Sequence, residues 1–232
     1  MSTNLPTLAI LGGTGKEGPG LALRWAYAGY PILIGSRQAE KAQATAADLT
    51  VRLNQQKSQA IAPPSIRGME NHEAARAADI CILTVVHTAH QAALQSLRES
   101  LKGKILVDAT ARVDFRDPRP PKPPAAARYA QNLLGPEVRV VAAFQNVPAH
   151  VLRKNLGQTL DTDVLICADD LTAAQEVRKL AEAAGMRAYI AGGLDNAVVV
   201  EGITALLIGL NQHYGIRTAS IQVTGIESGT VR

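Results

Sequence analysis

Apolar runs and amphipathic segments alternate along almost the whole chain of 232 residues. Runs typical of buried strands lie at 7–12, 30–36, 78–86, 103–110, 137–144, 161–170 and 186–193. Helical patterns lie between them at 15–28, 39–56, 71–78, 90–101, 125–134 and 171–185, and a long, largely apolar helix is predicted at 196–215. Alternation of strand and helix is typical of a parallel sheet with crossover helices on both faces. The sequence therefore predicts an α/β fold with a doubly wound parallel sheet.

Two segments interrupt this alternation. Residues 59–69 form an irregular link with room for one short strand. Residues 111–124, "ARVDFRDPRPPKPP", contain five prolines, which exclude the interiors of regular helices and strands. This second segment is predicted to be a loop. It is either an exposed rigid connection or a lid over a neighbouring site, and the sequence leaves both open.

The composition favours a protein that binds small molecules over one that binds nucleic acid. Apolar residues make up 47% of the chain and aromatic residues 3%, and the net charge of +4 is spread without a run of five like charges. A nucleic-acid binder concentrates its cations on one face, so local positive charge here suits a small anionic ligand better. Cys81 and Cys167 stand far apart inside apolar runs and are predicted to be buried, unpaired side chains.

The sequence also carries expectations about location and assembly. The N-terminus has no charged-then-apolar signal pattern, and no apolar stretch is expected to reach membrane-spanning length, so we expect a cytoplasmic chain without a membrane partner. The helix at 196–215 is apolar around most of its circumference, and such a helix needs burial on several sides. A subunit interface, and hence a homodimer, is predicted there.

A cluster of glycines lies between the first predicted strand and the first predicted helix, in "LAILGGTGKEGPG". Gly13, Gly15 and Gly18 have the spacing G-x-G-x-x-G, in the strand-turn-helix context that a dinucleotide fingerprint requires. Such glycines allow a tight turn, let the backbone approach a pyrophosphate, and let helix and strand pack closely. The predicted cofactor-binding residues here are Gly12, Gly13, Thr14, Gly15, Lys16 and Gly18. Because Glu17 lies in the first helical turn, its carboxylate has to point away from bound phosphates.

The end of the second strand indicates which dinucleotide binds. An enzyme that prefers NAD usually carries an acidic residue there, whereas this chain reads "IGSRQAEK". Ser36, Arg37 and Lys41 place a hydroxyl and two cations where the ribose 2′-phosphate of NADP would lie. The alternative is that Ser36 caps a helix and the cations are solvated. We favour NADP and a Rossmann-type domain.

With "GGTG", "IGSRQAEK", "VRVVAAFQNVPAHVL", "DVLICADD" and "LDNAVVVEGITALLIGLN", the chain resembles the NADPH-dependent reductases of coenzyme F-420, from about residue 7 to 213. Coenzyme F-420 is a deazaflavin that carries hydride. The resemblance implies a Rossmann domain (1–145), a small C-terminal α/β domain (146–232) and a dimer. It also implies that the deazaflavin stacks over the nicotinamide in the cleft between the domains, and that Thr14, Gly15, Ser36, Arg37 and Lys41 bind NADP.

Two further segments are carried over by the same resemblance. Val85, Val86 and His87 lie on the nicotinamide-ribose side, where relatives often have a proline followed by an aromatic residue. Gln145, Asn146 and Pro148 match a segment in which relatives often have a histidine or asparagine. With His87, these residues are predicted to position the substrates, and no residue is predicted to act as an acid, base or nucleophile. Hydride transfer depends mainly on positioning and on exclusion of water.

The histidines leave several alternatives open. His87 and His90 have i, i+3 spacing, but no third metal ligand lies nearby in the sequence, so we expect His87 to line the cleft, His90 to open a helix, and no metal site. His150 either hydrogen-bonds the deazaflavin or caps a helix, while Asp169 and Asp170 are expected to cap one. The alternative functions are reduction of another acceptor, such as a flavin or an imine, and a non-catalytic NADP-binding module.

Overall fold

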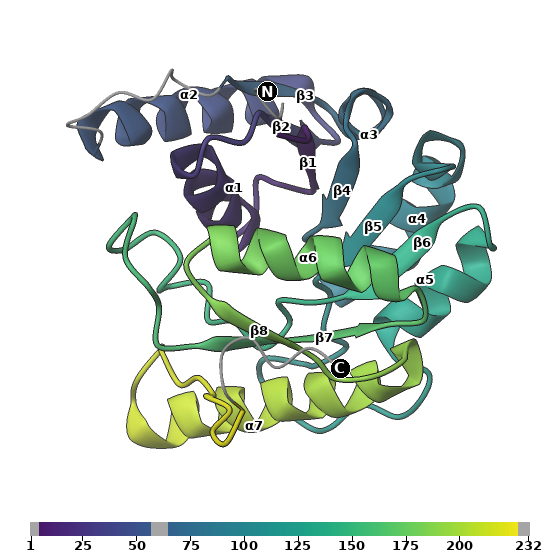
Figure 1. Ribbon diagram of the computed structural model, residues 1–232, viewed down its shortest axis with the longest axis vertical. Helices are drawn as coiled ribbons and strands as arrows, with labels where there is room; N and C mark the ends of the chain where they lie inside the picture. Colours follow the sequence, from purple (N-terminus) through teal and green to yellow (C-terminus); the bar gives the residue numbers. More distant parts are fainter. Residues whose placement is uncertain (1–4, 57–64, 227–232) are drawn as a thin grey trace.

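The computed structural model describes residues 5–56 and 65–226, whose eight strands form one sheet in the order β3-β2-β1-β4-β5-β6-β7-β8 (Figure 1). The strands are β1 (Leu8–Leu11), β2 (Ile32–Ser36), β3 (Ile66–Glu70), β4 (Ile80–Leu83), β5 (Ile105–Asp108), β6 (Arg139–Ala142), β7 (Asp163–Ala168) and β8 (Arg187–Ile190). All neighbouring strands are parallel except β6 and β7. The predicted doubly wound α/β sheet is confirmed, with one antiparallel junction.

Helices cover both faces of this sheet. They are α1 (Gly18–Tyr27), α2 (Ala39–Gln56), α3 (Asn71–Ala77), α4 (His87–Leu101), α5 (Ala126–Leu134), α6 (Leu171–Ala183), the short 3₁₀ turn η1 (Leu194–Asn196) and α7 (Ala197–Tyr214). One core layer joins α1, α2 and α6 to the sheet, and the other joins α3, α4, α5 and the start of α7. Side chains alternate between the two layers along each strand, as Ile10 and Leu11 of β1 do, because successive strand residues point to opposite faces.

The element boundaries differ from the predicted ones in a few places. The strands that were predicted with ranges are two to five residues shorter in the structure than in the prediction. Helix α1 begins at Gly18 because the preceding residues form the turn. The short strand expected within 59–69 is β3, although residues 57–64 lie outside the described part of the chain. Helix α4 begins at His87, so the prediction that His90 opens it was wrong. The proline-rich segment 111–124 contains no helix or strand, as predicted.

Helix α1 is bound to the C-terminal part of the chain by two buried polar side chains. The Arg24 guanidinium donates hydrogen bonds to backbone carbonyls of 152, 154 and 184, at 2.9, 2.6 and 2.9 Å. The Trp25 indole N–H donates to the Leu180 carbonyl at 2.7 Å. The loop 144–160 is thereby fixed against α1, at the edge of the sheet where the glycine turn lies.

Helix α7 corrects one expectation from the sequence. Within the described residues, the stretch Leu194–Tyr214 is long and apolar enough to cross a membrane by length and composition, whereas no such stretch was expected. Part of this stretch is core, since Ala197, Val200 and Leu207 are buried against the rest of the fold. The glutamate within it, Glu201, is fully buried.

Candidate active site

The predicted cofactor residues gather at one edge of the sheet. The glycine turn follows β1, Ser36 ends β2, Val85 follows β4 and Gln145 follows β6. Because these strands are parallel, their carboxyl ends meet at the same edge. From β1 the sheet grows in two directions, through β2 and β3 on one side and through β4 and β5 on the other. Open α/β sheets bind ligands at such a switch point in the strand order.

Three glycines of the turn are required by close contacts. Gly12 has φ +70°, and a Cβ on it would lie 2.5 Å from Cγ1 of Val85. A Cβ on Gly18 would lie 2.8 Å from both the Gly13 Cα and the Thr84 hydroxyl oxygen. A Cβ on Gly13 would meet the Ile10 carbonyl oxygen at 2.6 Å. The tight turn and the close approach of helix to strand that the spacing predicts are therefore present.

Hydrogen bonds hold the inner side of this turn to the ends of the neighbouring strands. The Gly13 N–H donates to the Gly35 carbonyl at 2.9 Å, and the Gly12 N–H donates to Oδ1 of Asn71 at 3.0 Å. The outer residues 14–16 are exposed, so the backbone there is accessible to a ligand. A turn held in this way at a helix N-terminus suits the pyrophosphate of a dinucleotide.

The carboxyl group of Glu17 is turned inward beside this turn. Its Oε1 is buried and has no hydrogen-bond partner among the described residues. Burial raises the pKa of Glu17 to about 8, so the group is mostly protonated and uncharged at pH 7. Helix α1 begins at Gly18, so Glu17 precedes the helix and does not lie in its first turn as predicted. A neutral carboxyl does not repel a pyrophosphate, which explains how a glutamate can stand directly before this helix.

We expect replacement of Glu17 by glutamine to remove a pH dependence of stability. Because the folded protein keeps this proton up to about pH 8 and the unfolded chain loses it near its ordinary pKa, wild-type stability falls as pH rises between these values. The slope is at most about 1.4 kcal/mol per pH unit for one proton. Melting temperatures of both proteins from pH 5 to 9 test this, and parallel curves would contradict the assignment.

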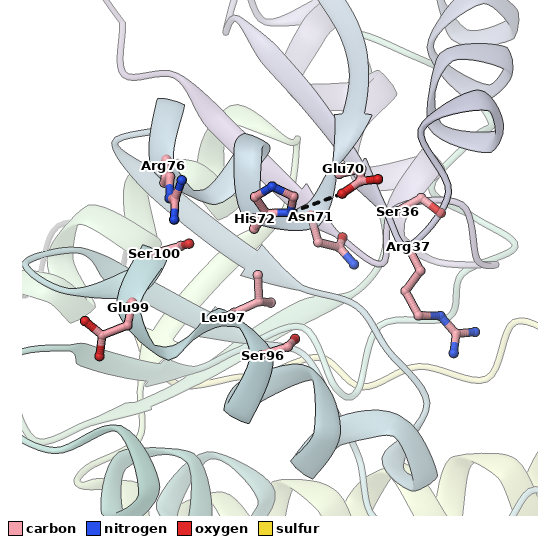
Figure 2. A pocket seen from close by; sticks show the side chains of 10 residues that line it. All are labelled: Ser36, Arg37, Glu70, Asn71, His72, Arg76, Ser96, Leu97, Glu99 and Ser100. Carbon is pink, nitrogen blue, oxygen red and sulfur yellow. Dashed lines mark ion pairs between the residues drawn. The ribbon is translucent and has the colours of Figure 1, made fainter.

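Ser36 and Arg37 open into a cavity of about 500 Å³ (Figure 2). The Ser36 hydroxyl accepts a hydrogen bond from the Gln38 N–H at 3.3 Å, as expected of a residue that precedes a helix. Arg37 is exposed, and Lys41 is exposed one turn into α2 but does not line the cavity. The cavity is lined by Ser36, Arg37, Glu70, Asn71, His72, Arg76, Ser96, Leu97, Glu99 and Ser100.

Two carboxylates line this cavity: Glu99 of α4, which pairs with Lys102 at 2.9 Å, and Glu70 at the end of the neighbouring strand β3. Glu70 pairs in register with Ser36, but its side chain accepts from the backbone at Glu73 and lies 3.3 Å from Nδ1 of His72. The Glu70 carboxylate is therefore engaged with the start of α3, while the guanidinium of Arg37 extends free of an ion pair in this set of described residues. Cations and hydroxyls around an open cavity can bind a phosphate monoester.

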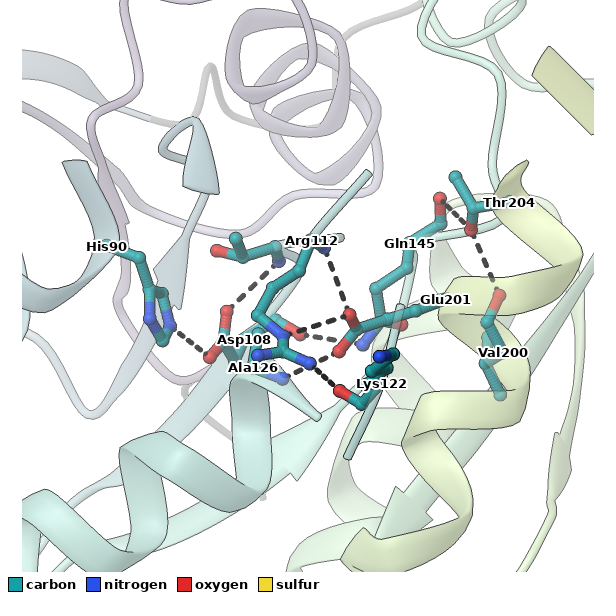
Figure 3. Close-up of polar contacts among 10 residues, drawn as sticks. His90, Asp108, Arg112, Lys122, Ala126, Gln145, Val200, Glu201 and Thr204 are labelled. Carbon is teal, nitrogen blue, oxygen red and sulfur yellow. Dashed lines mark hydrogen bonds and ion pairs between the residues drawn. The ribbon is translucent and has the colours of Figure 1, made fainter. Parts of the chain in front are cut away.

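The segment after β4 is divided between surface and core. Val85 is partly buried, while Val86 and His87 are exposed at the start of α4. His90, one turn later, is buried, and its Nε2 lies 2.7 Å from Oδ2 of Asp108 at the end of β5 (Figure 3). The other oxygen of Asp108 accepts from the Thr110 N–H at 3.0 Å. His90 is thus an internal polar contact between α4 and β5.

The segment after β6 turns sharply toward the core. Phe144 has φ +73° and packs edge-on against Trp25, with ring centroids 5.6 Å apart. Gln145 follows; its amide donates to the Asp108 carbonyl at 3.2 Å, and its buried Oε1 has no partner among the described residues. The Asn146 amide donates to the Asp163 carbonyl of β7 at 2.7 Å. Both side chains are buried, whereas Pro148 is partly exposed.

Glu201 of α7 holds both ends of the proline-rich segment (Figure 3). One carboxylate oxygen accepts from the Arg112 N–H at 3.0 Å and the other from the Ala126 N–H at 2.6 Å. Burial is the largest influence on the Glu201 carboxyl and raises its pKa, against the opposing effect of these N–H donors. The proline-rich segment is also fixed to α7 at Phe115, whose carbonyl accepts from the Gln212 amide at 2.7 Å.

The remaining polar predictions have mixed outcomes. Asp170 caps α6 by accepting from the Ala173 N–H at 2.9 Å, but Asp169 pairs instead with Arg128 at 2.7 Å. His150 lies in a run of turns, so there is no helix for it to cap. Cys81 and Cys167 are buried and free, as predicted. Within residues 5–56 and 65–226, no group of three His, Cys, Asp or Glu side chains is arranged to hold a metal ion.

The sequence did not reveal three polar residues with long-range contacts, of which Asp108 and Glu201 are buried and Asn71 is partly buried. Asn71, Asp108 and Glu201 each bind groups from distant segments, and no local motif marks those partners. Glu201 alone carried a signal, because a single carboxylate inside an apolar helix requires a buried partner.

Comparisons with known proteins identify the family of this chain. Residues 7–112 match the family described as NADP oxidoreductase, coenzyme F-420-dependent. The F-420-dependent NADP reductase of Methanothermobacter marburgensis is 41% identical over 227 residues, covering 94% of this chain and 98% of that protein. The reductase of the same name from Methanocaldococcus jannaschii is 40% identical over 228 residues, covering 95% of this chain and 99% of that protein.

A solved structure supports the fold alone. A protein from an Arthrobacter species, assigned provisionally as an F-420-dependent NADP reductase, superposes with a TM-score of 0.75 at 24% identity and covers 95% of this chain and 100% of its own. The identity of 41% and 40% to the two archaeal reductases, over nearly their full length, shows that the chain belongs to the F-420-dependent NADP reductase family.

Proposed function

We propose that this protein transfers a hydride between NADP(H) and coenzyme F-420. The observation that carries the proposal is the cavity at the end of β2, where Ser36 and Arg37 lie next to a glycine turn shaped for a pyrophosphate. NAD-preferring sites usually have an acidic residue at the end of this strand, and here the position holds a serine. The names of the full-length archaeal relatives supply the second substrate.

The roles of the residues follow from their places at the sheet edge. Gly12, Gly13, Thr14, Gly15, Lys16 and Gly18 would hold the pyrophosphate, and Ser36, Arg37 and Lys41 the 2′-phosphate. Val85, Val86 and His87 follow β4, and Pro148 lies in the segment after β6, where they would line the nicotinamide and deazaflavin. Gln145 and Asn146 are buried and would act indirectly, because their hydrogen bonds fix the turn that follows β6.

The chemistry asks little of the protein beyond positioning. In the reaction, NADPH gives a hydride to the deazaflavin, which also takes up a proton, leaving NADP⁺ and the reduced coenzyme. The chain contributes strand ends held in the sheet and a pre-formed glycine turn, which position the two reacting rings. The buried His90–Asp108 pair lies within the core and is assigned no proton-transfer step.

A direct assay tests this function. Purified protein is mixed with NADPH and coenzyme F-420, and the absorbance of each chromophore is followed. Oxidation of NADPH in step with bleaching of F-420 is expected. Turnover with a flavin or a small imine, but not with F-420, would assign the protein to the alternative enzyme class. Tight NADPH binding without turnover on any acceptor would make it a non-catalytic module.

We further infer a division into an NADP-binding domain (1–145) and a small C-terminal domain (146–232), with a homodimer formed through α7. The proposed boundary lies in the turn after β6, just before the one antiparallel junction of the sheet. Val199, Leu206, Leu210 and Tyr214 are exposed along α7 at helical spacing, with exposed fractions of 62% and 64% at the first two. A second copy of this chain would cover that apolar stripe.

Replacement of Leu206 by glutamate should disrupt the dimer. A carboxylate at the centre of the apolar stripe would be buried without a partner on association, and this cost favours the monomer. Sedimentation velocity measures the change, and Gln175→Glu on α6 is a control that adds the same charge elsewhere. An unchanged dimer, or a wild-type monomer, would contradict the proposed interface.

The other proposed properties rest on composition and packing. We place the protein in the cytoplasm with small-molecule substrates and without nucleic-acid or membrane partners. The mild net charge of +4 supports this, and so does the burial of Glu201 and its helical neighbours inside the fold.

A further inference from the structure

Asn71 connects three strand ends of the cofactor edge. It is the first residue of α3, and its side chain crosses the end of β2 to reach the turn after β1. Its Oδ1 accepts from the Gly12 N–H at 3.0 Å, although the two residues lie 59 positions apart in the chain. A Cβ on Gly35 would lie 2.7 Å from that oxygen. The glycine at position 35 therefore makes room for the Asn71 side chain.

The backbone beneath Asn71 is held firmly. Glu70 pairs with Ser36 in the parallel register of β2 and β3. The Glu70 side chain accepts from the Glu73 backbone, and the Glu73 carboxylate accepts from the Glu70 N–H at 3.3 Å. These reciprocal hydrogen bonds fix the start of α3. Asn71 is consequently presented to the glycine turn in one orientation.

The other end of the same side chain faces the cavity. Since Oδ1 accepts the Gly12 hydrogen bond, the amide NH₂ is directed away from the turn. Figure 2 shows it pointing into the space between Arg37 and Leu97, both of which line the cavity. An uncharged donor with two N–H groups stands there, beside a cation and a hydroxyl.

We propose that Asn71 is a positioning and specificity residue for the dinucleotide. Its carbonyl oxygen fixes the pyrophosphate turn through Gly12, and its amide donates to the 2′-phosphate held by Ser36 and Arg37. One side chain thus couples the two anion subsites. This inference rests on the proposed NADP site and adds a residue from outside the glycine turn and β2.

Two variants separate the two functions of the side chain. Asn71→Ala removes both, so NADH is expected to bind about tenfold more weakly because the shared turn loosens, and NADPH more weakly still. Asn71→Asp keeps an acceptor for Gly12 but replaces the donor with a negative charge. NADH should then bind within about twofold of wild type, while NADPH loses about tenfold or more by repulsion of the phosphate.

Binding is measured by titration calorimetry with NADPH and with NADH, without a hydride acceptor. The matched controls are Asn132→Ala and Asn132→Asp, at an exposed asparagine of α5 outside this cavity. Both should bind like wild type. Melting temperatures without cofactor show whether each variant folds, and Asn71→Ser replaces the alanine variant if that one does not.

Two results would each overturn the inference: NADH affinity unchanged in Asn71→Ala, or a wild-type preference for NADPH in Asn71→Asp. These outcomes are distinct from failure of the proposed reaction. If the expected binding pattern is found but F-420 is not reduced, the reaction is wrong and the role of Asn71 stands. If F-420 is reduced normally but the expected binding pattern is absent, the proposed reaction stands and the role of Asn71 is wrong.

Discussion

Replacement of Arg37 by alanine should weaken NADPH binding by about 10- to 100-fold while leaving NADH binding nearly unchanged. Arg37 lines the cavity at the end of β2 directly after Ser36, and a guanidinium binds phosphate through a fork of N–H donors. Hydrogen bonds to charged groups contribute about 1.5–3 kcal/mol each, which corresponds to this range of affinity. Titration of both nucleotides against both proteins measures the ratio.

The control for this prediction is Arg52→Ala, which removes the same group from the far end of α2. Arg52 is exposed and pairs only with Asp48, one turn earlier on the same helix, in the described structure. Its loss should leave both affinities alone. Equal losses of NADPH and NADH affinity in Arg37→Ala would show that the 2′-phosphate is bound elsewhere.

The second large effect is expected from His90→Phe. The side chains of His90 and Asp108 are 6% and 0% exposed, with Nε2 and Oδ2 2.7 Å apart. Phenylalanine fills similar space but leaves the buried Oδ2 of Asp108 without a partner. Loss of one member of a buried pair typically costs about 3–5 kcal/mol, so the free energy of unfolding should fall by roughly this amount. Urea denaturation measures it.

Two further proteins make that measurement specific. His213→Phe changes an exposed histidine of α7 and should alter stability by less than about 0.5 kcal/mol. The double variant with His90→Phe and Asp108→Leu removes both polar groups, and part of the lost stability should return. A double variant less stable than His90→Phe alone would show that Asp108 is held mainly by its other contacts.

The fold could be predicted because its signal is local. Buried parallel strands are apolar throughout, as "LAIL" in β1 and "ICIL" in β4 are, and each is followed by a helix of clear period. β3 was harder to predict because "IRGME" is an edge strand with an arginine and a glutamate among its five residues. The start of α4 was misplaced because the helix begins with polar and small residues at 87–89.

The site could be predicted only where sequence neighbours form it. The glycine turn and the end of β2 are continuous motifs, so Gly12, Ser36 and Arg37 could be proposed directly from the sequence. Asn71 and Glu201 act on backbone groups 59 and 89 positions away, and such pairings depend on the packed sheet. The hydrogen bond from the Asn146 amide to the Asp163 carbonyl could not be predicted either, because it depends on the left-handed Phe144, which turns the chain inward.

The hydrogen bonds of Glu201 to the backbone of Arg112 and Ala126 bear on how far the length of the proline-rich segment can vary. Because one carboxylate holds both ends of the intervening segment, the stability of the fold should depend little on the number of residues between them. Doubling a flexible loop costs only about 0.6 kcal/mol in closure entropy. The proline-rich segment is therefore a suitable place to insert a tag, a reporter or a tether, at a position away from the contact of Phe115 with Gln212.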